Sequence, residues 1–135
     1  IGMSLGSTKQ DVARAVMEGI CFEMYDIVLA EAAAGIDVDV IRLTGGASRS
    51  PMWVQMMADI CQRPIQTLQA EESGCLGAAM YAGVGVGVYD DVHDAARRAV
   101  KIKDEYTPNP ANYGAYEEAH ARFVSVYEAL NGRHF

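Results

Sequence analysis

The sequence predicts an α/β fold, in which helices pack on a β-sheet. Segments with the 3.6-residue periodicity of amphipathic helices alternate with short apolar runs that are typical of buried strands, and such alternation characterises α/β layer structures. The 135 residues fit one domain. Half of the residues are apolar, which is enough for a hydrophobic core. We therefore expect a single α/β domain without an internal repeat or a linker.

The first predicted element is a long helix between Ser7 and Gly35. Ser7 and Gln10 have the spacing of a capping box, and Gly35 suits the left-handed conformation that ends many helices. At 1.5 Å per residue the helix would be about 40 Å long, enough to cross a whole sheet. Its apolar residues recur every four positions: Val12, Val16, Ile20, Met24 and Val28.

A strand, a glycine loop, a second helix and a second strand follow. Consecutive apolar residues within 38–44 predict a buried strand. Ser50 suits an N-cap and Pro51 the first helical position, while Arg63-Pro64 would end the helix. Residues 65–68 form the second predicted strand. The apolar stripe of the helix is Met52, Trp53, Met56, Met57 and Ile60.

The rest of the chain predicts three more helices and an extended segment. Residues 71–73 open a helix that is rich in small residues, which suggests that another backbone packs closely against it. A short helix is expected near 91–100 and an extended segment at 101–107. A last helix, with an aromatic stripe from Tyr113 to Leu130, would end at Asn131-Gly132.

Composition and charge argue against several functional classes. The net charge of −7 opposes binding to nucleic acid. No apolar run reaches the roughly 18 residues of a membrane span, and residues 1–8 lack the features of a signal peptide. Cys21, Cys61 and Cys75 form no C-x-x-C pair, so we interpret them as reduced core thiols of a cytoplasmic protein. The scattered histidines His93, His120 and His134 predict no metal site.

The sequence following the first strand carries the strongest functional signal. In Gly45-Gly46-Ala47-Ser48-Arg49-Ser50-Pro51, glycines lie between a strand and a helix start. Glycine lets a ligand approach the backbone, and free N–H groups at a helix start can bind phosphate or polar atoms of a nucleotide. Ligands of α/β sheets bind beyond the carboxyl ends of strands. The alternative is a plain tight turn, and no Walker A motif is present.

Several motifs together resemble the C-terminal domain of the FGGY family of carbohydrate kinases. The match covers nearly the whole chain, in order and at the family's spacing, and is most similar to the xylulokinase branch. Its motifs are R-A-x-x-E-G at 14–19, G-G-small-x-x-S-P-x-W at 45–53, D-x-x-x-R-P at 59–64, the small-residue helix at 72–79, and the ending around Tyr106, Thr107, Pro108, Tyr116, Phe123 and Tyr127.

The resemblance implies a ribonuclease-H-like, actin-like ATPase domain that binds ATP with Mg²⁺, as part of an enzyme that phosphorylates a sugar, a pentulose such as xylulose. Gly45, Gly46 and Ala47 would line the adenosine and phosphate side, Ser50 would contact adenine or ribose, and Arg49 could approach phosphate or remain solvated. Residues 1–135 would be an incomplete C-terminal domain, inactive alone. The catalytic base, the Mg²⁺ ligands and the sugar-binding domain would lie upstream of Ile1.

The resemblance also suggests roles for other residues. Trp53 would be a packing residue and Glu18 a buried ion-pair partner, while the small-residue helix would permit close packing at an interdomain hinge. We expect Asp59, Asp90 and Asp91 to be helix-surface or capping residues, and we assign no catalytic residue to this chain.

Two alternatives remain open at this point. An incomplete sheet exposes a strand edge, so the chain could instead be a non-catalytic interaction module that forms a homodimer. It could also belong to another ATPase of the actin-like superfamily, although the S-P-x-W motif and the small-residue helix favour the sugar-kinase branch.

Overall fold

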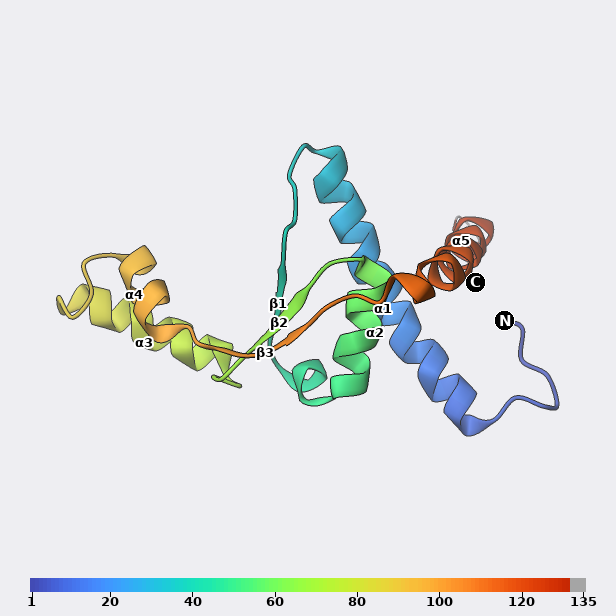
Figure 1. The fold of residues 1–135 in the computed structure, drawn as a ribbon, viewed down its shortest axis with the longest axis horizontal. Helices are drawn as coiled ribbons and strands as arrows, with labels where there is room; N and C mark the ends of the chain where they lie inside the picture. Colours follow the sequence, from blue (N-terminus) through green and yellow to red (C-terminus); the bar gives the residue numbers. More distant parts are fainter. Residues whose placement is uncertain (132–135) are drawn as a thin grey trace.

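The computed structural model describes residues 1–131 and shows a mixed α/β chain (Figure 1). Helices α1, α2 and α5 pack together beside a three-stranded sheet, while α3 and α4 pair with each other in an arm on the opposite side. The elements in order are α1 (Lys9–Ala33), β1 (Ile41–Leu43), η1 (Gly46–Arg49), α2 (Pro51–Cys61), β2 (Ile65–Leu68), α3 (Ser73–Gly85), α4 (Val92–Ala99), β3 (Ile102–Tyr106), η2 (Pro110–Asn112) and α5 (Tyr113–Leu130).

Helix α1 begins one residue later than the predicted capping box. Thr8 is the N-cap: its hydroxyl accepts from the Asp11 amide at 3.2 Å, and the Asp11 carboxylate accepts from the Thr8 amide at 2.9 Å. The box predicted from Ser7 and Gln10 is therefore wrong, because the ionised Asp11 is a stronger reciprocal acceptor than an amide side chain. Gly35 adopts the predicted left-handed conformation, with φ of 81°.

The sheet has the order β1-β2-β3. Strand β1 runs parallel to β2, with Ile41 opposite Ile65 and Leu43 opposite Thr67. Strand β3 runs antiparallel to β2. The first strand is shorter than the predicted 38–44, since the Val38 carbonyl accepts a hydrogen bond from Arg63 Nε at 2.7 Å and does not join the sheet ladder. The second predicted strand, 65–68, is confirmed.

The hydrophobic core centres on α2. The predicted residues Met56, Met57 and Ile60 are buried and Trp53 packs against them, whereas Met52 is 63% exposed. Helix α1 contributes Cys21 and Phe22 to this core. Helix α2 ends at Cys61, just before the predicted Arg63-Pro64, with Gln62 left-handed.

Asp59 is buried and does not lie on the helix surface. The residue is 4% exposed. Its carboxylate accepts from Gln55 Nε2 at 2.8 Å, from the Asn109 amide at 2.8 Å and from Asn112 Nδ2 at 2.7 Å. A buried carboxylate needs such donors. The network joins α2 to η2 and so fixes where α5 begins. The surface or capping role predicted for Asp59 is wrong, but Asp91 does cap α4, by accepting from the Asp94 amide at 2.7 Å.

The close packing predicted for the small-residue helix, α3, is seen at only one of its glycines. A Cβ on Gly83 would lie 2.6 Å from the Tyr89 ring, so this glycine permits close packing inside the arm. A Cβ on Gly74, Gly77 or Gly85 would meet nothing within 4 Å in the described part of the chain. Close packing of another backbone on α3 therefore remains a prediction.

Other sequence-based expectations have mixed outcomes. Glu18 forms the predicted ion pair, with Arg14 Nε at 2.8 Å, but is only half-buried. Cys21 and Cys61 are core thiols, whereas Cys75 is exposed. On α5, His120 hydrogen-bonds Asp26 Oδ1 at 2.8 Å and packs on the Tyr25 ring.

Two expectations concern the end of the chain. The predicted helix end at Asn131-Gly132 lies partly outside the described residues, and His134 lies wholly outside them. Over residues 1–131, no helix is long and apolar enough to cross a membrane.

We predict that Asp59→Asn lowers the free energy of unfolding by about 1–3 kcal/mol. The amide that replaces one carboxylate oxygen would face a donor, which leaves at least one buried hydrogen bond unmade. The midpoint of urea unfolding measures the effect. Asp104→Asn, which changes an exposed residue of β3, is the matched control and should shift stability by less than about 0.5 kcal/mol. Equal effects of the two changes would contradict the network.

Burial also predicts how the thiols react. It raises the pKa of Cys21 to about 11 and that of Cys61 to about 12, so neither forms the reactive thiolate near pH 8. A thiol reagent should modify one cysteine, Cys75, in the folded chain and all three after unfolding. Rapid modification of all three in the folded chain would contradict this burial.

The same burial predicts how stability depends on pH. The two buried thiols stay protonated at pH values where the thiols of the unfolded chain ionise. Their contribution to stability is therefore complete below about pH 8.5 and is lost as the pH rises toward 11 and 12.

Candidate functional site

The candidate site lies at the carboxyl edge of the parallel strands β1 and β2. Since the two strands run in the same direction, the segments that follow them emerge at one edge of the sheet (Figure 1). The segment after β1 is Thr44 followed by the glycine loop, and the segment after β2 leads through Glu71 and Glu72 into α3. The Thr44 and Ser73 hydroxyls form a hydrogen bond of 3.1 Å between these two segments.

The glycine loop is a single 3₁₀ turn, which refines the tight loop expected from the sequence. Gly45 has φ of 80° and ψ of −160°, a conformation that favours glycine. The Gly45 carbonyl accepts from the Ser48 hydroxyl at 2.7 Å and from the Ser48 amide at 3.2 Å. The Ser50 amide donates to the Ala47 carbonyl at 3.2 Å. These bonds hold the turn in one shape and present its glycines outward.

The face of the loop is open. Gly45 and Gly46 are exposed, and a Cβ on either would meet nothing within 4 Å. Ala47 and Ser50 are half-buried. Ser50 is the N-cap of α2, as predicted, but its hydroxyl makes no capping hydrogen bond to the helix. The backbone of both glycines can therefore meet a polar ligand without a protein side chain intervening, and the Ser50 hydroxyl is not used as a helix cap.

Helix α3 begins directly beside this loop. The first amide of the turn to bond within the helix is that of Leu76, which donates to the Glu72 carbonyl at 3.1 Å. The amides of Ser73, Gly74 and Cys75 precede it and belong to the end of a helix that favours anions. The loop and the helix start thus place two sets of backbone donors at one sheet edge.

Arg49 is held by carboxylates of the second segment. Its Nη2 lies 2.9 Å from Glu71 Oε2 and 3.9 Å from Glu72 Oε1. The structure therefore brings all five predicted site residues, Gly45, Gly46, Ala47, Arg49 and Ser50, into one turn with α3 beside it. Sequence reasoning missed Thr44, Glu71 and Ser73 as neighbours of this turn. The sequence signal that could have placed them there is the succession of a strand at 38–44, a helix and a strand at 65–68, which favours a parallel pair.

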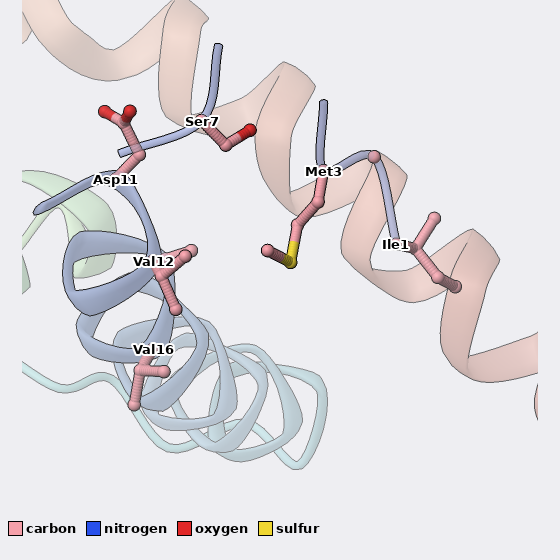
Figure 2. Close-up of a pocket in the computed structure, with 8 residues that line it drawn as sticks. Ile1, Met3, Ser7, Asp11, Val12 and Val16 are labelled. Atoms are coloured by element: carbon pink, nitrogen blue, oxygen red, sulfur yellow. The ribbon is translucent and has the colours of Figure 1, made fainter. Parts of the chain in front are cut away.

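A separate hollow of about 390 Å³ lies between residues 1–7 and the first half of α1. Figure 2 shows Met3 and Ile1 on the terminal segment, beside Val12 and Val16 of the helix. Its lining is mostly apolar, and Asp11, its one charged lining residue, is occupied by the α1 cap. None of the five predicted site residues lines this hollow, and an apolar wall with a carboxylate is poorly suited to phosphate.

Comparison with known proteins identifies relatives of this chain. The family model described as the FGGY family of carbohydrate kinases, C-terminal domain, matches residues 1–86. The chain is 36% identical over 130 residues to the xylulose kinase of Staphylococcus epidermidis, covering 96% of this chain and 25% of that protein. It is 32% identical over 133 residues to the L-xylulose/3-keto-L-gulonate kinase of Escherichia coli, covering 98% and 27%.

A solved structure is similar over the same extent. The ligand-bound xylulose kinase from Lactobacillus acidophilus matches with a TM-score of 0.83 and 28% identity, over 98% of this chain and 27% of that chain. This likeness confirms the predicted actin-like α/β fold class. The chain thus spans about a quarter of the length of the relatives that it matches.

Proposed function

The chain belongs to the FGGY family of carbohydrate kinases, and we propose that it is the nucleotide-binding part of a kinase that transfers the γ-phosphate of MgATP to a sugar hydroxyl. The observation that carries the proposal is the exposed Gly45-Gly46 turn beside the start of α3, at the carboxyl edge of two parallel strands. This arrangement offers backbone donors to a nucleotide, as phosphate sites at helix starts do.

Each predicted site residue has a distinct part in this proposal. Gly45, Gly46 and Ala47 line the adenosine and phosphate side, where the lack of large side chains lets the ligand reach the backbone. The hydroxyl of Ser50, which α2 leaves unused as a cap, hydrogen-bonds adenine or ribose. Arg49 lies at the rim, where its positive charge offsets Glu71 and Glu72.

Phosphoryl transfer depends on positioning and on stabilisation of charge. The sugar hydroxyl oxygen forms a bond to the γ-phosphorus as the bond to the ADP oxygen breaks, and the hydroxyl proton passes to a base. We place that base, together with the ligands of the Mg²⁺ that accompanies ATP, in the portion of the kinase that corresponds to the other three quarters of its relatives. Closure of that portion over the open glycine turn would exclude water. This chain alone would then bind nucleotide without catalysing transfer.

For the sugar, we propose xylulose as the first candidate. Both curated relatives are named for xylulose. One relative is also named for 3-keto-L-gulonate, so substrate choice differs among proteins that share this part. We assign the choice of sugar to residues outside this chain.

A second candidate is the interaction module. Strand β1 pairs with β2 alone within residues 1–131, so one edge of β1 is free, and α1 exposes Val12, Val16, Ile20 and Ile27. These features favour an interface with more protein. Light scattering of the isolated chain tests whether it forms a homodimer. A monomer at all concentrations would rule the homodimer out. The free edge of β1 and the exposed residues of α1 would then be proposed to contact the remaining portion of the kinase.

We predict that the chain binds MgADP with a Kd near the millimolar range, about −4 kcal/mol, and that Gly46→Val abolishes the binding. A Cβ at Gly46 would meet no protein atom within 4 Å, so the valine should obstruct the ligand with little disturbance of the fold. Calorimetric titration measures the affinity. Gly114→Val, in the first turn of α5 and equally free of neighbours, is the matched control and should bind like the unchanged chain.

Two outcomes would count against the proposed site. Undiminished binding by Gly46→Val would place the nucleotide elsewhere. If the folded chain alone binds no MgADP, the same pair of variants in the full-length kinase decides: Gly46→Val should raise the KM for MgATP at least about tenfold, which corresponds to about 1.4 kcal/mol. An unchanged KM would contradict the site.

A further inference from the structure

The glycine turn is attached at both of its ends to the segment that leads into α3. Thr44, which precedes Gly45, hydrogen-bonds Ser73 at 3.1 Å. Arg49, the last residue of η1, forms an ion pair with Glu71 at 2.9 Å. The exposed turn 45–48 thus lies between two cross-connections to 71–73. Together they connect the glycine turn to the segment that precedes the first amides of α3.

Arg49 lies nearer to one of the two acids that precede α3. Glu71 and Glu72 are adjacent carboxylates just before the start of α3, and both lie within 4 Å of the Arg49 guanidinium. The separation of 2.9 Å makes Glu71 the main partner, because Glu72 lies at the longer separation of 3.9 Å.

We propose that Arg49 is a positioning residue, which acts through its ion pair with Glu71 to hold the Gly45-Gly46 turn against the start of α3. This inference rests on the proposed function, because it presupposes that MgATP binds at the turn. It assigns Arg49 a role other than direct contact with phosphate. Such contact would have to come from Nη1 or Nε, since Nη2 already pairs with the Glu71 carboxylate at 2.9 Å.

The two roles make opposite predictions for Glu71→Arg. If Arg49 positions the turn, a second arginine repels it and weakens nucleotide binding. If Arg49 contacts phosphate, the change removes a competing carboxylate, adds positive charge and strengthens binding. The charge exchange Arg49→Glu with Glu71→Arg separates the roles again, since it restores an ion pair but places a carboxylate where phosphate contact would need a cation.

The experiment measures kcat and the KM for MgATP in the full-length kinase that carries this chain. Both partners are more than half exposed, with side-chain exposures of 59% and 58%, so the effects should be those of a surface ion pair. We expect Arg49→Glu and Glu71→Arg each to raise the KM at least about twofold with little change in kcat. The exchanged double variant should return the KM to within about 1.5-fold of the original. Glu72→Gln, at the longer 3.9 Å separation, should have little effect.

Ionic strength gives a second readout. The Debye length falls to about 3 Å at 1 M salt, so the KM ratio of each single variant to the unchanged enzyme should approach one there. A lower KM for Glu71→Arg, or a double variant no better than Arg49→Glu, would overturn the positioning role. Gly46→Val in the same assay separates the two proposals: if it leaves the KM unchanged, the nucleotide site itself is misplaced. If it raises the KM while the exchange fails to rescue, only the role of Arg49 is wrong.

Discussion

The parallel pairing of β1 with β2 is the constraint on which the rest of this structure depends. Parallel neighbours require a crossover connection, and here α2 provides it. Because both strands then end at one edge, the turn after β1 and the start of α3 after β2 become neighbours despite the roughly 25 residues between them. An antiparallel hairpin of the same two strands would place these segments at opposite edges and would leave no shared site.

Helix α2 transmits this constraint to the remainder of the fold. It begins at the glycine turn, and its buried side chains Val54, Met57 and Ile60 pack on α1 and the sheet. Each such side chain contributes about 1.5–3 kcal/mol through burial, whereas an exposed ion pair such as Arg49–Glu71 contributes about 1 kcal/mol or less. The core therefore decides the fold, and the weaker surface contacts can adjust the turn without endangering it. Near the other end of α2, the Asp59 carboxylate accepts hydrogen bonds from Asn109 and Asn112 and so holds the segment that leads into α5.

Local features could be predicted well from the sequence. The strand at 65–68, the cap position of Ser50, the left-handed Gly35 and the five residues of the turn follow from short-range patterns or from family motifs. Features that depend on distant partners could not. Asp59 looked like a surface acid because its donors Asn109 and Asn112 lie about 50 residues further along the chain. Strand β1 looked longer because nothing near Val38 shows that Arg63 takes its carbonyl. The ion pair between Arg49 and Glu71 could be predicted only once the parallel register of β1 and β2 was known.

If the proposed site is correct, nucleotide binds where the glycine turn meets α3. Backbone amide chemical shifts of the isotopically labelled protein, recorded while MgADP is added, test it most directly. We expect the largest shift changes at residues 45–49 and 73–75, the two donor segments at the carboxyl edge of the sheet. Shift changes confined to residues 1–16, around the apolar hollow of α1, or absent from both donor segments at saturating MgADP would contradict it.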